Sequence, residues 1–521
     1  MNPEEIEKKQ KRVMIYVMIV SLICVVGVSY AFFTAGMSSE TSTTVRADAG
    51  TMKITYNGGA NINLAGIYPK DDVWATKTIT VTGNNTTDAE MYYKLTLVVD
   101  SNTFKTDDPL QYELVSTNTS TNGEIIPNIS KTDITGTSIE LGSGHFVKAN
   151  NAKHTYLLKI YYPKKTTSQN ANQGAAFSAH VEITSAKAPK TNGKLSELVL
   201  YNNEVKTPIT APGKEVSTAS EALLASTEDD YGTSYYFRGA VTNNYVEFAN
   251  KCWRIVRVGG DGSVKLILHN DNTTGVANPC DAANNSASAA FARYSNETYK
   301  SAFNTNYNDN AYVGFKYGTV GASDYASAHA NTNKSTILTN LETWYNNNLK
   351  AYESVIDDNV WCNDKTKVTD TSYNPWSYGG NATGLGYGTN KTYYGATQRL
   401  ISTSNSAGGT GPSLKCNGEL SKITSKVGLI TADELAFAGY AFERNNTTTY
   451  LQENATDSRW WSLSPGRFGS SYACVWFVGG SSVDFNDYYV DNSYGVRPLI
   501  SLKPSTYVTG NGTSDKPYKV I

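Results

Sequence analysis

The stretch from Trp460 to Lys503 holds the residues best suited to chemistry, and that chemistry is noncovalent recognition. It is rich in Tyr, Trp, Asn, Asp, Ser and Gly. Binding loops favour these residues because rigid amphipathic rings supply contact area at a low entropy cost, while small polar groups adapt their hydrogen bonds. The candidate ligand-contacting residues are Arg467, Phe468, Tyr472, Trp476, Phe477, Asp484, Phe485, Asn486, Asp487, Tyr488, Tyr489, Asp491, Asn492 and Tyr494. A second interpretation is that this stretch is the aromatic-rich end of a β-domain, with half-buried rings.

Two short motifs frame these candidates. Trp460-Trp461-x-x-Ser-Pro precedes them, and Gly495-Val496-Arg497-Pro498 follows them and runs into an apolar strand. We expect Trp460, Trp461 and Arg497 to form the scaffold, with Arg497 bridging backbone carbonyls or a buried acid. The framing motifs resemble the C-terminal end of the C-type-lectin-like fold, and the resemblance covers about residues 235–521.

The resemblance to this fold has functional implications. The fold is shared by formylglycine-generating-enzyme-like domains and by the variable proteins of diversity-generating retroelements. In the variable proteins, the stretch before Gly-Val-Arg-Pro holds the diversified ligand contacts, here roughly Arg467 to Tyr494. In the enzymes, a cysteine pair works with copper, so a copper oxidase is the alternative function. The fold often binds calcium, which leaves calcium open without any ligand being identified.

The six cysteines predict disulfides. Cys24 lies in an apolar N-terminal segment, which leaves five others. Disulfides are expected in an oxidising exterior. Cys362 with Cys416 is the first choice because both lie in polar loop sequences that flank a long excursion, and Cys252 with Cys280 is the second. Cys474 is left over, and in an aromatic strand it behaves as a small hydrophobe.

Other catalytic or metal chemistry has no visible sequence motif. The five His residues are scattered, with no HExxH, Cys-x-x-Cys, Gly-x-Ser-x-Gly or P-loop pattern, so we expect no metal site and no catalytic residue. Asp433 and Glu434 follow Thr431, which predicts a capping box at a helix N-terminus in preference to a catalytic carboxylate pair. Charged residues are 18% of the chain and the formal net charge is −2, which argues against a nucleic-acid partner.

The N-terminal segment, residues 1–34, is expected to be a cytoplasmic stub with a membrane anchor or a signal peptide. The apolar run from Val13 to Phe33 reaches the roughly 20 residues that span a bilayer. Lys8, Lys9, Lys11 and Arg12 precede it, which places the N-terminus in the cytoplasm and the rest of the chain outside. Small residues at Ser29 and Ala31 also suit cleavage near Ala31, which would release a secreted protein.

Residues 35–187 are expected to form an all-β, immunoglobulin-like sandwich that acts as a spacer. Lys77 to Thr82 and Met91 to Val99 alternate with period two, and further strands are expected at 110–115, 155–162 and 176–184. Ser116 to Ser143 is expected to be a long polar insertion. Phe32-Phe33-Thr34-Ala35, residues 49–54 and residues 67–72 resemble TasA/camelysin-type surface proteins of Gram-positive bacteria. That resemblance implies the same sandwich and, in some members, fibre assembly.

The rest of the chain is expected to be a linker, residues 188–230, and an α+β C-type-lectin-like domain, residues 231–521. Short helices are expected in the linker at Leu195 to Tyr201 and Ala219 to Ala225. In the domain, Gly259 to Gly262 predicts a hairpin turn, and apolar residues from Ile337 to Ile356 recur at helical spacing.

Together these patterns predict a multidomain cell-surface protein, anchored or secreted, that recognises an extracellular protein or glycan. A copper oxidase of the formylglycine-generating type and a structural fibre or matrix subunit are the alternatives.

Overall fold

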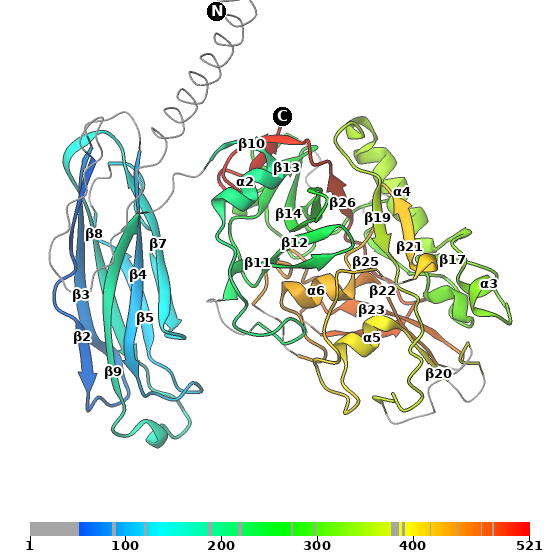
Figure 1. The fold of residues 1–521 in the computed structure, drawn as a ribbon, viewed down its shortest axis with the longest axis horizontal. Helices are drawn as coiled ribbons and strands as arrows, with labels where there is room; N and C mark the ends of the chain where they lie inside the picture. The colour runs from blue at the N-terminus through cyan, green and yellow to red at the C-terminus, as the bar shows by residue number, and fades with distance from the viewer. Residues whose placement is uncertain are drawn as a thin grey trace, which may run out of the picture. The chain divides into compact units, whose positions relative to one another are not determined.

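The computed structural model divides the chain into two compact units, Met1–Ala188 and Pro189–Ile521. It describes residues 52–85, 90–118, 122–185, 190–216, 221–271, 275–295, 298–376, 385–387, 391–416, 418–444, 446, 448–469, 471–481 and 484–521. The expected membrane segment, Val13 to Phe33, lies outside these ranges. Within them, every helix is too short or too polar to span a bilayer. In both units most of the regular secondary structure is β-strand (Figure 1).

The first unit is built from two antiparallel sheets. One has the order β1-β3-β8-β5-β6 and the other β2-β9-β4-β7. The strands are β1 (Met52–Asn57), β2 (Ile62–Ala65), β3 (Lys70–Asn85), β4 (Met91–Asn102), β5 (Gln111–Ser116), β6 (Ile129–Asp133), β7 (Ser138–Phe146), β8 (Ala149–Tyr162) and β9 (Ala176–Ser185).

Side chains from both sheets meet in one core. Ile79 on β3, Leu95 on β4 and Leu158 on β8 belong to the same buried cluster. Buried and partly exposed residues alternate along β4, as period two requires when one face of a sheet covers a core. The predicted strands are therefore confirmed. The prediction of a polar insertion at residues 116–143 is wrong, because β6 and most of β7 lie there and β7 pairs with β4.

The second unit contains two larger sheets. The first has the order β10-β27-β28-β13-β14-β12-β11, with β15 between β14 and β26. Its strands are β10 (Asn192–Lys194), β11 (Leu223–Asp229), β12 (Gly232–Arg238), β13 (Tyr245–Phe248), β14 (Lys251–Val258), β15 (Val264–Asn270), β26 (Leu499–Leu502), β27 (Tyr507–Thr509) and β28 (Tyr518–Val520). The predicted hairpin is confirmed as β14 and β15.

The other large sheet has the order β16-β25-β22-β23-β24, with β20 paired to β22. Its strands are β16 (Lys300–Ser301), β20 (Lys391–Tyr393), β22 (Trp460–Gly469), β23 (Ala473–Val478), β24 (Phe485–Tyr489) and β25 (Tyr494–Gly495). Two small ladders pair β17 (Lys316–Tyr317) with β18 (Asn333–Lys334) and β19 (Asn359–Cys362) with β21 (Lys422–Ser425).

Helices complete the core of the second unit. They are α2 (Leu195–Asn202), α3 (Tyr325–His329), α4 (Thr336–Asn348), α5 (Gly395–Leu400) and α6 (Ala432–Ala438). α4 begins where the Ser335 side chain accepts a hydrogen bond from the Leu338 N–H, and it buries Trp344 in the core that also holds Trp253 and Trp476. The helical stripe is confirmed, but α4 ends at Asn348, before Ile356.

The expected linker, residues 188–230, is largely part of the second unit. β10 pairs with β27, and α2 buries Leu195, Leu198 and Val199 in the core. The first short helix is confirmed as α2. The second expected helix is wrong where it is described, because β11 begins at Leu223 and pairs with β12.

Candidate functional site

The expected ligand-contacting stretch folds into β22, β23 and β24, which pair in that order as antiparallel neighbours. All six residues of β23 are buried. Six of the fourteen candidates therefore belong to the protein interior, and the prediction that they contact a ligand is wrong: Phe468, Trp476, Phe477, Phe485, Asp487 and Tyr494.

Aromatic packing on both sides of β23 is the physical reason for this burial. The Trp476 ring lies 4.7 Å from that of Phe485 and 6.1 Å from that of Phe442. The Phe477 ring lies 5.5 Å from that of Tyr494. Phe, Tyr and Trp side chains bury more apolar surface than other side chains, so their burial contributes strongly to folding. The aromatic content of the stretch therefore builds the core.

Asp487 is buried together with a cation. Arg467 Nη1 donates to Asp487 Oδ1 at 2.7 Å, and the Arg467 guanidinium lies 4.1 Å from the centre of the Trp376 ring. Burial raises the pKa of Asp487, and Arg467 opposes that rise. Gly466 permits this packing, since a Cβ there would lie 2.5 Å from Asp487 Oδ2. Arg467 thus supports the interior from a partly exposed position.

The remaining candidates form an outward-facing patch at edge strand β24. We call it the tyrosine surface and define it as Tyr472, Asn486, Tyr488, Tyr489, Asp491 and Asn492, all partly or fully exposed. Tyr488 is 40% exposed. The Tyr489 ring lies 4.8 Å from that of Tyr488 and 4.6 Å from that of Tyr472. Asp484, also partly exposed, precedes the strand.

The three expected scaffold residues are fully buried. Arg497 Nε donates to the Leu268 carbonyl at 2.9 Å, and Arg497 Nη1 donates to the Leu451 carbonyl. Its guanidinium lies 5.0 Å from the centre of the Trp460 ring, and Trp461 Nε1 donates to the Ser301 carbonyl at 2.9 Å. The prediction that Arg497 bridges backbone carbonyls is confirmed. Arg497 thereby joins strand β15 to the segment around Leu451.

A second feature of this unit is a polar cavity, which we call the charged pocket. Its deep lining consists of seven buried or nearly buried ionic residues: Asp229, Arg257, Lys265, Asp364, Arg399, Asp433 and Glu434. They come from β11, β14, β15, the segment after β19, α5 and α6. The space open to the centres of water-sized molecules is about 40 Å³.

Two ion-pair groups organise the charged pocket. Arg257 lies between Asp229 at 2.8 Å and Glu434 at 3.0 Å, and Lys265 lies 3.0 Å from the same Glu434 oxygen. Arg399 donates through Nε and Nη2 to the two oxygens of Asp433, at 2.6 and 2.8 Å, and through Nη1 to Asp364 at 2.8 Å. A bidentate pair of this kind fixes geometry as well as charge.

Glu434 also caps helix α6. Its side chain accepts from the Thr431 N–H at 3.0 Å, while the Thr431 hydroxyl accepts from the Glu434 N–H, so the predicted capping box is confirmed. Burial alone would raise the pKa of Glu434, but Lys265 and Arg257 reverse this and lower it to about 2. Glu434 is therefore an anion at neutral pH.

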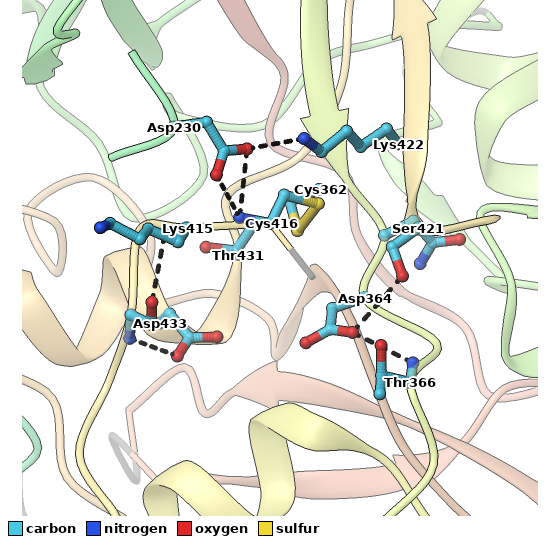
Figure 2. The surroundings of a disulfide bond; sticks show 12 residues. Asp230, Cys362, Asp364, Thr366, Lys415, Cys416, Ser421, Lys422, Thr431 and Asp433 are labelled. Carbon is cyan, nitrogen blue, oxygen red and sulfur yellow. Dashed lines mark hydrogen bonds and ion pairs between the residues drawn. A yellow bond between two sulfur atoms is a disulfide. The ribbon is translucent and has the colours of Figure 1, made fainter. Parts of the chain in front are cut away.

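The Cys362–Cys416 disulfide lines the charged pocket. Figure 2 shows the side chains around it. Asp230 accepts from the Cys416 N–H at 3.2 Å and pairs with Lys422 at 3.0 Å, while Asp364 accepts from the Thr366 N–H at 3.0 Å. The second bond, Cys252–Cys280, lies in a separate buried cluster with Tyr245. Both pairs are those expected from the sequence. Cys474 is a buried free thiol, and its burial raises its pKa.

The copper-oxidase alternative requires two thiolates in one site. Cys362 and Cys416 line the charged pocket, but their sulfur atoms are bonded to each other. Across the described ranges, no group of three or more His, Cys, Asp or Glu residues could hold a metal ion. This donor set does not fit a copper centre, so we derive no step through copper.

Sequence reasoning missed the charged pocket because its residues are far apart in the chain. Asp229, Arg257 and Arg399 belong to no recognisable motif, and only Asp433 and Glu434 carry a local signal, the capping box. Folding brings them together across more than 200 positions of sequence.

Comparison with known proteins does not assign this chain to a family. The chain matches no model of a known protein family, and a search of curated proteins finds no match.

Proposed function

We propose that the protein is exported and recognises a ligand outside the cell through the tyrosine surface. In this proposal the first unit is an immunoglobulin-like spacer, and the second unit is a C-type-lectin-like domain. The segment Val13 to Phe33 anchors the chain in a membrane or directs its secretion. The ligand is a protein or a glycan.

The single observation that carries the proposal is the exposure of Tyr488 within a cluster of three tyrosine rings. Tyr472, Tyr489 and Tyr488 contact one another in sequence, so each ring restricts the rotamers of the next. Rings held in this way lose little further entropy when a ligand binds. Asn486, Asp491 and Asn492 provide polar groups at the edge. This is the composition of an aromatic anchor with a polar rim.

The buried candidates limit how this surface could be diversified. Free variation at Phe468, Trp476 or Phe485 would change the core of the unit. We therefore restrict the diversification proposal to the outward positions of the tyrosine surface. A near-copy of the coding region for Arg467 to Tyr494 beside a reverse transcriptase gene would support it, with differences concentrated at the outward codons.

Binding of the labelled full chain to an array of glycans and extracellular proteins tests the proposal. Replacing Tyr488 and Tyr489 by Ala should weaken binding to any captured ligand at least about tenfold, because aromatic anchors dominate such interfaces. Tyr507→Ala is the matched control, since Tyr507 is 51% exposed on β27 and lies outside the tyrosine surface. Unchanged binding by the double variant, or an equal loss in the control, would contradict the proposal.

A further inference from the structure

We propose that the charged pocket is a binding site for a primary alkylammonium group, such as a lysine side chain. This site is independent of the tyrosine surface, which shares no residue with it.

The first argument is charge balance in the pocket's interior. Four carboxylates, Asp229, Asp364, Asp433 and Glu434, line it together with three cations, Arg257, Lys265 and Arg399. The four carboxylates and Lys265 have side chains at most 5% exposed, and the two Arg side chains are 12–13% exposed. The interior therefore holds one negative charge more than its cations balance. A buried uncompensated charge is costly, so a cation that enters the pocket is favoured.

The rim does not remove this excess. Asp230 is paired with Lys422, and Asp261 adds a further exposed carboxylate. Lys415 is exposed on the rim, and among the described residues no carboxylate lies within ion-pair distance of its Nζ. The rim is therefore neutral overall and does not cancel the negative charge of the interior.

The second argument is the hydrogen-bonding capacity of the lining. Each cation of the lining already donates to a carboxylate: Arg399 through Nε, Nη1 and Nη2, Arg257 through Nε and Nη1, and Lys265 through Nζ. Carboxylates accept about four hydrogen bonds each, whereas Asp433 and Glu434 each accept three from described residues. The lining can thus accept further donors, and an ammonium group supplies three.

The third argument is size and shape. A water needs roughly 10–15 Å³ of such space, so about 40 Å³ holds around three water-sized groups. This suits an ammonium group with one or two methylenes. Val360, Leu414 and the Cys362–Cys416 disulfide provide apolar contacts for the methylene stem, and exposed Tyr231 lies at the rim. The chemistry therefore matches an alkylammonium tip inserted from solvent.

Titration of the full chain with small probes tests the site. N-acetyl-lysine amide should bind saturably and at least about tenfold more tightly than N-acetyl-norleucine amide, its uncharged counterpart. Acetate should not compete. Glycinamide and methylammonium distinguish other sources of the same chemistry. If glycinamide bound as tightly as the lysine probe, the site would be assigned to a chain N-terminus. If methylammonium bound as tightly as the lysine probe, the site would be assigned to free amines.

Isosteric removal of one pocket charge provides the matched test. Glu434→Gln keeps an oxygen for the Thr431 N–H but balances the interior charges, so it should weaken lysine-probe binding at least about tenfold. Glu221→Gln makes the same change in a buried pair with Arg238 outside the pocket and should leave binding unchanged. Asp261→Asn, at the exposed rim, should weaken binding about twofold to threefold and serves if Glu434→Gln fails to fold.

Three results would overturn the proposal. They are equal binding of the lysine and norleucine probes, competition by acetate, and unchanged affinity in a folded Glu434→Gln variant. Loss of tyrosine-surface binding in the Tyr488 and Tyr489 variant has no bearing on these measurements, so the two proposals can fail separately.

Discussion

Strand β4 of the first unit and strand β23 of the second are buried in different ways. Along β4, from Met91 to Val99, every second residue is buried and its neighbours are partly exposed. Along β23, Ala473–Val478, every residue is buried. β4 thus covers a core with one face, whereas β23 has protein on both faces.

This difference explains why similar residue types have different roles. In β4, Tyr92 and Thr96 at outward positions are partly exposed because the strand has a solvent side. In β23, Trp476 and Phe477 point to opposite faces and both are buried. Tyr488 is a surface residue because its strand, β24, lies at the edge of the sheet, whereas β23 lies inside it.

Alanine scanning of the two strands is expected to give the largest effects. Trp476→Ala should lower the free energy of unfolding of the second unit by about 3–5 kcal/mol, and its neighbour Val475→Ala by roughly 2 kcal/mol, because both leave cavities. In β4, Leu95→Ala should cost about 2–5 kcal/mol, while Thr96→Ala should stay within about 0.5 kcal/mol. Denaturant titration measures both. Alternating large and small effects along β23 would break the comparison.

The disulfides are expected to give the next largest difference in stability between the two units. Only Cys24 precedes residue 188, so a reductant should lower the stability of the second unit and leave the first unchanged. Replacing Cys362 and Cys416 by Ser opens a loop of 54 residues and should cost about 4 kcal/mol; the Cys252 and Cys280 variant, with a separation of 28, should cost slightly less. Calorimetry with and without dithiothreitol measures these shifts. A reductant-sensitive transition in the first unit would contradict this prediction.

Acid should destabilise the two units in different pH windows. Burial lowers the pKa of His154 from 6.5 to about 4, so the unfolded first unit binds the extra proton and stability falls between pH 6.5 and 4. Lys265 and Arg257 outweigh burial and lower the pKa of Glu434 from 4.5 to about 2, so the second unit loses stability between pH 4.5 and 2.

Each of these shifts is worth roughly 3 kcal/mol. Unfolding of His154→Gln and Glu434→Gln variants across pH provides the controls, since each should flatten the profile of its own unit only. If either variant altered both profiles, the assignment of the two windows would be wrong.

The smallest effect is expected at the tyrosine surface. Tyr488→Ala should change the free energy of unfolding by no more than about 1 kcal/mol, as Tyr507→Ala should, because the two residues are 40% and 51% exposed and lie outside the core. Phe485→Ala on the same strand should cost about 3–5 kcal/mol. A large loss for Tyr488→Ala would place it with the core and remove the basis of the recognition proposal.

The sequence correctly predicted the features that depend on local residue patterns. Period two identified the strands around Lys77 to Thr82 and Met91 to Val99, turn chemistry identified the β14–β15 hairpin, and the Thr431 and Glu434 spacing identified the start of α6. Both cysteine pairs and the carbonyl contacts of Arg497 also agree with expectation.

Features set by tertiary packing could not be predicted in this way. A strand buried on both faces has no alternation, so β23 gave no sign that its rings face inward. Residues 188–230 resemble a linker in sequence because no local pattern shows that β10 pairs with β27. The charged pocket depends on contacts between residues such as Arg257 and Glu434, 177 positions apart.

Lys194 lies opposite Tyr507, whose carbonyl accepts from the Ile521 N–H at 3.2 Å, so Lys194 and Ile521 are separated by about two strand spacings, roughly 10 Å. A short glycine-rich bridge can span that gap. Circular permutants that begin in an exposed turn should therefore retain this unit's sheet order, which makes the domain suitable for insertion into a loop of another protein.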